Sequence, residues 1–357
     1  MQTFQISRYP DFEDAISELD RMDDTLDLLS FLKAEDYVVS QLRENHSKSA
    51  PTARKLAKRI SAHADMAELY ARLSLTAPEK TSFLPGYYSI LNLAKCVSLC
   101  GSYHEEFNQQ AQWHGATYNP KKKQSHSILT DEVRVRGGGA LALFYKTVTG
   151  KEISTDHHLL MRDIYCLIRE VSSELVIATG VTKQPWLIEF SAMDVSGGIR
   201  VLATVTGFDG APFQGSVRTI PPLGGFKKQP KTKNVFEKRF PATAGLALVD
   251  EIRANINPEF LIYHNSDNTS AFLEQSPALP LTEEFTIALA FFHLSSVCRY
   301  NPEFMAKLST SKEWPMMLAL RRQGLYRFIQ STWSYFCLLY TSPSPRDRTR
   351  SRMPSSA

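Results

Sequence analysis

The sequence has few cysteines, and their spacing forms neither a disulfide framework nor a paired zinc motif. Apart from Cys337, which lies in an unusual C-terminal segment, they are Cys96, Cys100, Cys166 and Cys298. Disulfide-stabilised small domains and zinc fingers are therefore excluded, and this cysteine usage is typical of a reducing compartment. We accordingly expect a cytoplasmic protein that holds no metal and no cofactor.

The sequence also lacks a long apolar run. Its most apolar stretch, residues 287–298, is interrupted by His293 and falls short of the roughly 20 residues that cross a bilayer. Residues 1–20 are acidic and contain no apolar core of a signal peptide. With 43% hydrophobic and 22% charged residues, the composition is that of an ordinary globular protein. We expect no membrane segment, and a buried helix at residues 287–298.

Strong net charge is missing as well, once the C-terminal segment is set apart. Residues 337–357 resemble the translation of a sequencing-library adapter rather than native protein. They hold four arginines against Asp347 alone, and so supply +3 of the formal net charge of +4. The rest of the chain is close to neutral, which weakens any argument for nucleic-acid binding from charge. We expect residues 337–357 to form a non-native, disordered tail, and the native C-terminus to be missing.

No complete catalytic motif is present. Gly137–Gly139 lacks the Lys and Ser/Thr that follow in a phosphate-binding loop, and Gly150-Lys151 is followed by Glu152. No Gly-x-Ser-x-Gly sequence supplies a nucleophilic serine. These absences favour a non-enzymatic role.

The first and last parts of the sequence are typical of helices. Helix-forming residues dominate 12–42 and 53–73, and apolar residues at helical spacing mark a helix that Pro85 opens and that Gly101 ends in a left-handed conformation. Toward the end of the chain, Thr282 and Asn301 are expected N-caps of two helices. Residues 312–336 are expected to form one more.

The middle of the chain shows the alternation of half-buried strands. Leu129, Val133 and Val135 share one face of a predicted strand at 129–136. Residues 140–148 are expected to return as a second strand, and residues 157–171 to form a helix. The best hairpin signal joins residues 186–193 to 199–208. We expect a mobile loop at 221–241 and a short strand at 259–264.

These elements predict an α+β fold in which the N- and C-terminal helices pack together around a central β-rich section. The predicted parts are an N-terminal helical segment (1–118), a β-rich section with one helix (119–275), a C-terminal helical segment (276–336) and the tail (337–357). The two helical segments are expected to share one apolar interior and so to bring His114 near Arg299.

Three segments together resemble the YaaC-like family of bacterial proteins. Residues 114–135 combine a His-Gly pair, a lysine run and an Asp-Glu-Val strand. Residues 87–95 look like the family's N-terminal helix with its tyrosine pair, and residues 293–300 look like the helix that ends in an Arg-Tyr pair. The order and spacing of the three segments agree with the family. The resemblance implies membership but no particular activity.

The helix at residues 87–95 is also similar to the second helix of HEPN helical bundles, which occur in RNA-cutting toxins and their inactive relatives. Active members carry an arginine, about four to six further residues and then a histidine. Here Arg59 and His63 are one residue too close, and no histidine follows Arg299. This resemblance therefore implies a HEPN-like bundle without RNase chemistry.

Arg299 and Tyr300 are the first candidates for a functional pair. Arginine always keeps its charge, and its planar fork binds carboxylate or phosphate through two hydrogen bonds. Arg299 follows an apolar helix, so we expect it to be partly buried. The structural alternative is that Arg299 offsets the negative end of this helix and pairs with Glu303 or another acid.

His114 is the second candidate, because the glycine after it permits a tight turn and a close approach of the backbone to a ligand. The alternative is a half-buried loop histidine with one hydrogen bond. Basic residues are the third candidate: Lys121, Lys122 and Lys123 with Arg134 and Arg136, and a second stretch from Lys227 to Arg239. Phosphate binding requires such charges to converge, whereas lysine runs in loops are commonly just solvated.

We therefore predict a non-enzymatic protein that binds a partner or an anionic ligand, RNA among the candidates, through His114, Lys121–Lys123 and Arg299. The alternative is an enzyme acting on RNA or a phosphorylated metabolite, with Arg299 stabilising negative charge and His114 as acid or base. A cleft shared by the two side chains would favour the enzyme, and an acid paired with Arg299 would count against it. A third hypothesis is a HEPN-like bundle that forms a homodimer, which would require an exposed apolar face on the helix at residues 87–99.

Overall fold

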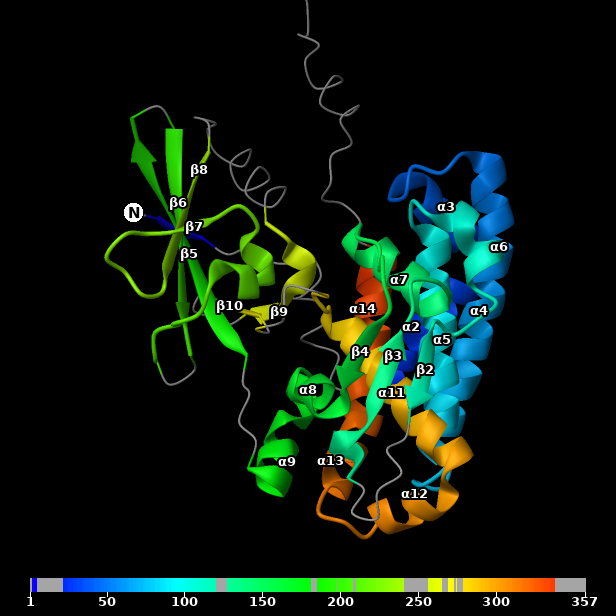
Figure 1. The fold of residues 1–357 in the computed structure, drawn as a ribbon. Helices are drawn as coiled ribbons and strands as arrows, with labels where there is room; N and C mark the ends of the chain where they lie inside the picture. Colours follow the sequence, from blue (N-terminus) through cyan, green and yellow to red (C-terminus); the bar gives the residue numbers. More distant parts are fainter. Residues whose placement is uncertain are drawn as a thin grey trace, which may run out of the picture.

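The computed structural model describes residues 2–4, 22–119, 127–180, 185–196, 198–207, 210–240, 256–264, 269–272, 274 and 279–337. Figure 1 shows them as a helical body and a lobe built on a β-sheet. The helical body contains both the first helices of the chain and the last. This arrangement confirms the predicted α+β fold.

Long helices from both ends of the chain form the centre of the helical body. They are α2 (Met22–Lys33), α3 (Glu35–Glu44), α4 (Ala50–Thr76), α5 (Phe83–Cys100), α11 (Glu283–Tyr300) and α14 (Leu325–Cys337). Helix α5 packs against α4, α11 and α14, and one apolar core extends from Leu26 to Phe336. The expectation that the two helical segments share one interior is therefore confirmed.

Side-chain caps place the starts of these helices as the sequence predicts. The Thr282 hydroxyl accepts a hydrogen bond from the Phe285 N–H at 3.2 Å, and the Asn301 side-chain oxygen accepts one from the Phe304 N–H at 3.2 Å. Each cap satisfies a peptide N–H that the first helical turn leaves unpaired. Helix α11 is buried from Glu283 to Val297. Among the described residues, no helix combines the length and apolar content needed to cross a membrane.

Shorter elements complete the helical body. They are η1 (His104–Glu106), α6 (Phe107–Gln110), η2 (Ile128–Thr130), α7 (Ala140–Thr149), α8 (Met161–Cys166), α9 (Arg169–Thr179), α12 (Pro302–Leu308) and α13 (Trp314–Ala319). A π-helical turn at Leu320–Gly324 joins α13 to α14. Arg321 in this turn donates hydrogen bonds to the carbonyls of Ser74 and Leu75 at the end of α4, at 3.2 and 2.6 Å. The helix predicted at 312–336 therefore exists with a local widening.

A three-stranded antiparallel sheet belongs to the helical body. Its order is β2 (Ala116–Asn119), β3 (Glu132–Val135) and β4 (His157–Leu160). Val133 and Val135 of β3 are fully buried, as their alternation predicts. Because β2 follows the His114 segment directly, this sheet fixes the position of that segment.

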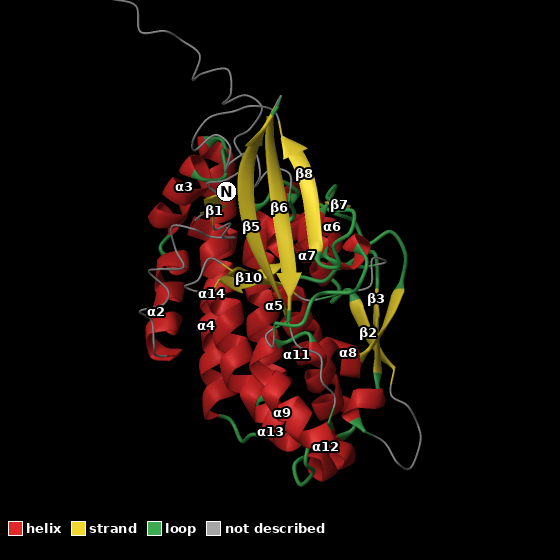
Figure 2. Ribbon diagram, turned by 90° about the vertical axis from the view of Figure 1, so that its left-hand side faces the viewer, coloured by secondary structure: helices red, strands yellow, loops and turns green. Residues whose placement is uncertain are grey.

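The lobe contains a seven-stranded sheet with the order β7-β8-β6-β5-β10-β9 and with β1 also paired to β5. The strands are β1 (Gln2–Phe4), β5 (Trp186–Val195), β6 (Gly198–Thr206), β7 (Lys227–Lys228), β8 (Val235–Phe240), β9 (Leu261–His264) and β10 (Thr269–Phe272). Figure 2 shows β5, β6 and β8 side by side. Strands β5 and β6 form the predicted hairpin, with Val195 opposite Gly198.

The lobe has its own apolar core, which includes Ile188, Val201 and Phe236. The core of the helical body, by contrast, also includes side chains between Ile128 and Leu175. The predicted boundary at residue 119 therefore separates residues that share one core. The described part of the sheet lobe begins, apart from β1, at β5.

The strand predicted at residues 140–148 is wrong, because these residues form helix α7. The run has no polar alternation, and a short apolar run alone does not distinguish a buried strand from a buried helix. Alanine and leucine favour the helix. Gly150 ends it in the left-handed conformation, with φ +68°, and donates its N–H to the Lys146 carbonyl.

The mobile loop predicted at residues 221–241 is also wrong. Besides the 3-10 turn η4 (Pro221–Leu223), this segment contains strands β7 and β8. Phe236 and Phe240 of β8 are buried. The lysines of β7 lie exposed on the edge strand of the sheet. Lysine on an edge strand opposes pairing with other chains, so this part of the second basic stretch has a structural explanation.

Smaller differences concern helix ends. The predicted helix at 12–42 breaks at Ala34 within its described part, and His157–Leu160 forms β4 before α8 begins. Gly101 ends α5 in an extended conformation with φ −68° and ψ −179°, not in the left-handed one. Cys337 is the last residue of α14, although the predicted tail began there. Residues 338–357 lie outside the described residues.

Acidification is expected to destabilise the fold through His46. Burial lowers the pKa of its imidazole from 6.5 to about 4, and its Nε2 lies 3.0 Å from the carbonyl oxygen of Phe336. Between these values the unfolded chain binds a proton that the folded chain excludes. The contribution of His46 to the free energy of unfolding is therefore fully present above about pH 6.5. It is lost as the pH falls toward 4, and this loss amounts to about 2–3 kcal/mol.

Urea unfolding of wild type and His46→Gln between pH 7.5 and 4.5 measures this effect. The variant should show a shallower loss of stability with falling pH. Burial also lowers the pKa of His63 and His104, so part of the slope should persist. Equal slopes in the two proteins would contradict the assignment to His46.

Candidate functional site

The segment that carries His114 lies against the start of α7. The first two peptide N–H groups of α7 donate to the carbonyls of Trp113 and His114, at 2.8 and 3.1 Å. Gly115 and Gly139 adopt φ values of +86° and +108°. A Cβ atom on Gly139 would lie 2.5 Å from the Cα of Gly115. The two glycines therefore allow the two backbone segments to approach closely, which larger residues would prevent.

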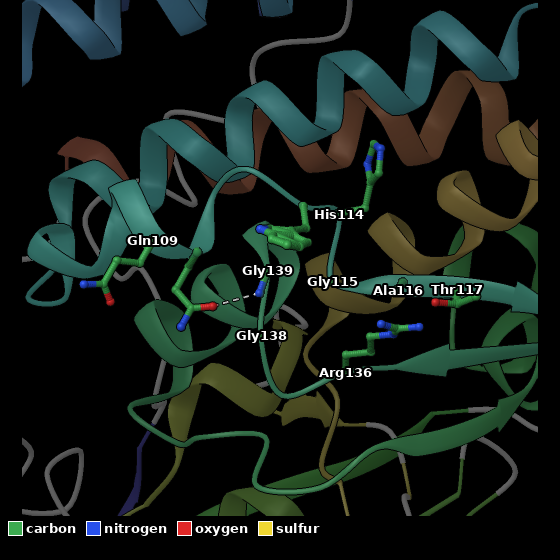
Figure 3. Close-up of a pocket in the computed structure, with 10 residues that line it drawn as sticks. Gln109, His114, Gly115, Ala116, Thr117, Arg136, Gly138 and Gly139 are labelled. Atoms are coloured by element: carbon green, nitrogen blue, oxygen red, sulfur yellow. Dashed lines mark hydrogen bonds between the residues drawn. The ribbon is translucent and has the colours of Figure 1, made fainter.

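A cavity of about 540 Å³ opens beside these two segments (Figure 3). Residues 109–110, 113–117, 136, 138 and 139 line it, and we call it the glycine cavity. Figure 3 shows Arg136 and Thr117 toward one end of it and Gln109 toward the other, with Gly138 and Gly139 between them. No acidic residue lines the cavity. The predicted ligand-binding residue Arg136 therefore lies in a cavity wall without a counter-charge.

His114 is held by aromatic neighbours. Its Nδ1 lies 2.7 Å from the hydroxyl oxygen of Tyr87 in α5, and its ring centroid lies 6.2 Å from that of Phe292 in α11. Burial lowers the pKa of the imidazole, and the positive charges of Arg299 and Lys95 lower it further. Burial raises the pKa of Tyr87. The pair is therefore neutral at pH 7.

Two cations, Lys95 and Arg299, lie close enough to His114 to act on its imidazole, and we call these two residues the cation cluster. Burial lowers the pKa of the half-buried Lys95 amine. Arg299 is exposed rather than partly buried, and its guanidinium carbon lies 5.0 Å from the ring centroid of Tyr300, which is 69% exposed. Within the part of the chain that the structure describes, neither cation makes an ion pair. The expected pairing of Arg299 with Glu303 is absent there.

The other basic candidates do not join this cluster. Arg134 donates hydrogen bonds to the Asp156 carboxylate, one of them at 2.8 Å from its Nε, so its charge is offset. Lys121, Lys122 and Lys123 lie outside the described residues. Of the basic residues between Lys121 and Arg136 that we predicted to bind a ligand, Arg134 and Arg136 are described, and of these two only Arg136 lacks an acidic partner among the described residues.

Sequence reasoning missed a buried polar network behind the site. Nε2 of His293 lies 2.9 Å from Oδ2 of Asp131, and both residues are fully buried. The Tyr165 hydroxyl lies 2.9 Å from Nδ1 of His293, and the Tyr118 hydroxyl donates to Oδ2 of Asp131 at 3.1 Å. These four residues join the three-stranded sheet, α8 and α11. They fix the sheet that follows His114 to α11, whose last turn contains Arg299.

The network had no local signal, because Asp131 and His293 stand 162 positions apart. Both lie in segments that carry the family resemblance, and that is where a signal could have been sought. The described residues include no group of three or more His, Cys, Asp or Glu side chains that would hold a metal ion.

A family model described as YaaC-like Protein matches residues 30–335. This range covers most of the chain and includes the three segments that carry the resemblance in the sequence. Neither the curated proteins nor the solved structures gave a match.

Proposed function

We infer that this chain, which belongs to the YaaC-like protein family, binds a small anionic molecule in the glycine cavity. One observation carries the proposal. It is a group of three cations at the cavity that no carboxylate offsets within the described residues. Arg136 lines the cavity, and the charges of Lys95 and Arg299 lower the pKa of His114 in the cavity wall. Cations without a protein counter-charge are suited to an anionic ligand, and arginine binds carboxylate or phosphate with two hydrogen bonds.

His114 connects the cavity to the cation cluster. It lines the cavity and also lies in the field of Lys95 and Arg299. Because the imidazole is neutral, it supplies a hydrogen bond to a ligand and no charge of its own. The few cysteines of the chain, spaced without a disulfide framework, suit a cytoplasmic setting for this binding.

Arg136→Gln is expected to weaken binding of small phosphorylated anions at least tenfold. A hydrogen bond to a charged group contributes about 1.5–3 kcal/mol, and about 1.4 kcal/mol corresponds to a tenfold change in affinity. Isothermal titration calorimetry with pyrophosphate, ribose 5-phosphate and adenosine 5′-monophosphate measures the effect. Lys95→Gln and Arg299→Gln should weaken the same ligands less, because they act through His114.

The matched control is Arg218→Gln, which removes an exposed arginine from the sheet lobe. It should bind all three ligands as wild type does. Wild-type protein that binds none of them, or an Arg136→Gln protein that binds them equally well, would remove the basis for an anion site in this cavity.

A second candidate function is an enzyme that acts on RNA or a phosphorylated metabolite. The observation that favours it is the neutral His114 imidazole, hydrogen-bonded to Tyr87 and in the field of Arg299. A neutral imidazole serves as a general base, and an arginine stabilises negative charge in a transition state. Turnover of a bound ligand that His114→Ala abolishes without loss of binding would establish this function instead.

The dimerising-bundle hypothesis finds less support. It required an exposed apolar face on the helix at residues 87–99, but the apolar side chains of α5 in this range are buried except for the half-buried Tyr88. The exposed apolar side chains of the neighbouring helix α4 are Met66, Leu69 and Leu73. The apolar side chains that α5 would need for this hypothesis are therefore not available at the surface.

A further inference from the structure

We propose that the ligand of the glycine cavity is a nucleotide whose base stacks on Trp113 while its phosphate binds Arg136. This inference rests on the proposed anion-binding function and adds the class of the ligand. Three properties of the cavity support it: an exposed aromatic side chain in its wall, an excess of side-chain hydrogen-bond donors without side-chain partners among the described residues, and a separation between an uncharged end and a cationic end.

Trp113 supplies the aromatic wall. Its side chain is 64% exposed, whereas tryptophan is on average a strongly buried residue. It lines the cavity, and its backbone carbonyl is fixed by the hydrogen bond from the start of α7. An indole held at the edge of a cavity offers a flat face to a planar ring, and stacking of this kind accepts any base.

Donors outnumber acceptors on the cavity walls. The side-chain oxygen of Gln110 accepts a hydrogen bond from the Gly139 N–H at 2.9 Å, which fixes the amide, and its NH₂ group has no partner among the residues that the structure describes. Gln109, Thr117 and Arg136 add further side-chain donors that have no side-chain partner among the described residues. A ligand rich in acceptors fits this set, and the ring nitrogens, carbonyls and phosphate of a nucleotide are acceptors.

The polar residues also divide between two ends. Figure 3 shows Gln109 at one end of the cavity and Arg136 with Thr117 at the other, and the glycines between them carry no side chains. An added Cβ on Gly138 would meet only the side-chain oxygen of Gln110, at 3.1 Å. The floor between the ends is therefore open backbone that a flat ring can approach. An uncharged end for a base and a cationic end for a phosphate match the two parts of a nucleotide.

The size of the cavity is consistent with a single nucleotide. Its volume of about 540 Å³ lies within the range of roughly 300–1,000 Å³ that is usual for small-ligand pockets. A base with one sugar phosphate fills such a space, whereas a longer strand would have to leave it. We therefore assign a mononucleotide rather than an RNA strand to this site.

The test compares ligands with and without a base, and a single nucleotide with a longer strand. Calorimetric titration uses adenosine 5′-monophosphate, guanosine 5′-monophosphate, ribose 5-phosphate and a single-stranded RNA hexamer, each with wild type, Trp113→Ala, Trp113→Phe and Ile177→Ala. A mononucleotide should bind wild type roughly 5- to 150-fold more tightly than ribose 5-phosphate, the range expected for one stacked base. Trp113→Ala should lose this advantage, and Trp113→Phe should recover part of it.

Binding of ribose 5-phosphate should be the same in wild type and Trp113→Ala, because the phosphate contacts stay in place. Ile177→Ala removes a similarly exposed apolar side chain from α9, 84% exposed, and should change nothing. Equal affinity of wild type for ribose 5-phosphate and the mononucleotides would overturn the nucleotide assignment and leave the anion site standing. A hexamer that binds while the mononucleotides do not would also overturn it. Failure of every phosphorylated ligand would overturn the proposed function itself.

Discussion

Replacing Asp131 by alanine is expected to lower the free energy of unfolding by about 3–5 kcal/mol, the size of effect seen when one partner of a buried, hydrogen-bonded acid–base pair is removed. Asp131 and His293 are both fully buried, with 2.9 Å between the carboxylate oxygen and the imidazole nitrogen. Without the carboxylate, the imidazole loses this hydrogen bond in an interior where water cannot replace it. A loss of this size is a large share of the stability of an ordinary domain.

The effect should extend beyond the pair, because the network joins separate elements. Tyr118 lies in β2 and Tyr165 in α8, and their hydroxyls bind Asp131 and His293 respectively. The network therefore fixes the three-stranded sheet to α11. His114 precedes this sheet and Arg299 lies at the end of α11, so a shift between them would change the site as well as the stability.

Urea denaturation followed by circular dichroism measures the loss, and Asp156→Ala is the matched control. The Asp156 carboxylate likewise pairs with a side chain of the same sheet, that of Arg134 in β3, but Arg134 is exposed. Loss of the Asp156 carboxylate should therefore change the free energy of unfolding by less than about 1 kcal/mol. His293→Ala should destabilise the Asp131→Ala protein less than it destabilises wild type. The difference between the two losses, which is the coupling energy of the pair, should be about 0.5–3 kcal/mol. Similar losses for Asp131→Ala and Asp156→Ala, or strictly additive effects of the pair, would show that the network does not stabilise the fold.

The parts of this fold that were predictable from sequence have local causes. Thr282 and Asn301 cap helices because each is a short polar residue directly before a helix-forming segment. The cap and the start of the helix lie within a few residues of each other, so a short stretch of sequence is enough to predict them. The β5–β6 hairpin follows from alternation on both sides of a glycine-containing turn. The shared core of the first and last helices followed from their apolar content, because each needed a partner to bury it.

The parts that were missed depend on three-dimensional context. Residues 140–145 of helix α7 are all buried, so the apolar run carries no periodicity that would distinguish a helix from a strand. Asp131 and His293 meet only because the sheet packs against α11, which no local pattern encodes. Trp113 lies exposed in a cavity wall, and its sequence neighbours give no sign of that position.

The candidate site falls between these two cases. His114 was a candidate because a glycine follows it, and Arg136 was a candidate as part of a basic surface; both line the glycine cavity. Their neighbours were not recognisable, because Lys95 occupies an ordinary helical position in α5 and becomes part of the site only through the packing of α5 beside the His114 segment. Residue type therefore indicated the chemistry, and packing determined which residues act together.

Replacing Gly139 by alanine is expected to lower the free energy of unfolding by about 2–5 kcal/mol and to abolish ligand binding in the glycine cavity. Gly139 has φ +108° and ψ 175°, a region that is almost exclusive to glycine and strains other residues by about 1–3 kcal/mol. The new Cβ would also lie 2.5 Å from the backbone of Gly115, and such overpacking adds about 1–3 kcal/mol. Relief of this clash requires the two glycine segments to separate, which would deform the cavity.

Gly150→Ala is the matched control, because Gly150 also has a positive φ, +68°, but its added Cβ would meet nothing within 4 Å. It ends α7, the helix that Gly139 begins. This variant should lose only about 1–2 kcal/mol, the strain of the left-handed conformation alone, and should bind adenosine 5′-monophosphate as wild type does. Denaturation and calorimetry on the two variants separate backbone strain from the close contact. Both variants strain a backbone with positive φ, but only Gly139→Ala also places a Cβ against Gly115. If Gly139→Ala were as stable as Gly150→Ala and bound ligand normally, the close contact between the glycine segments would not be what shapes the cavity.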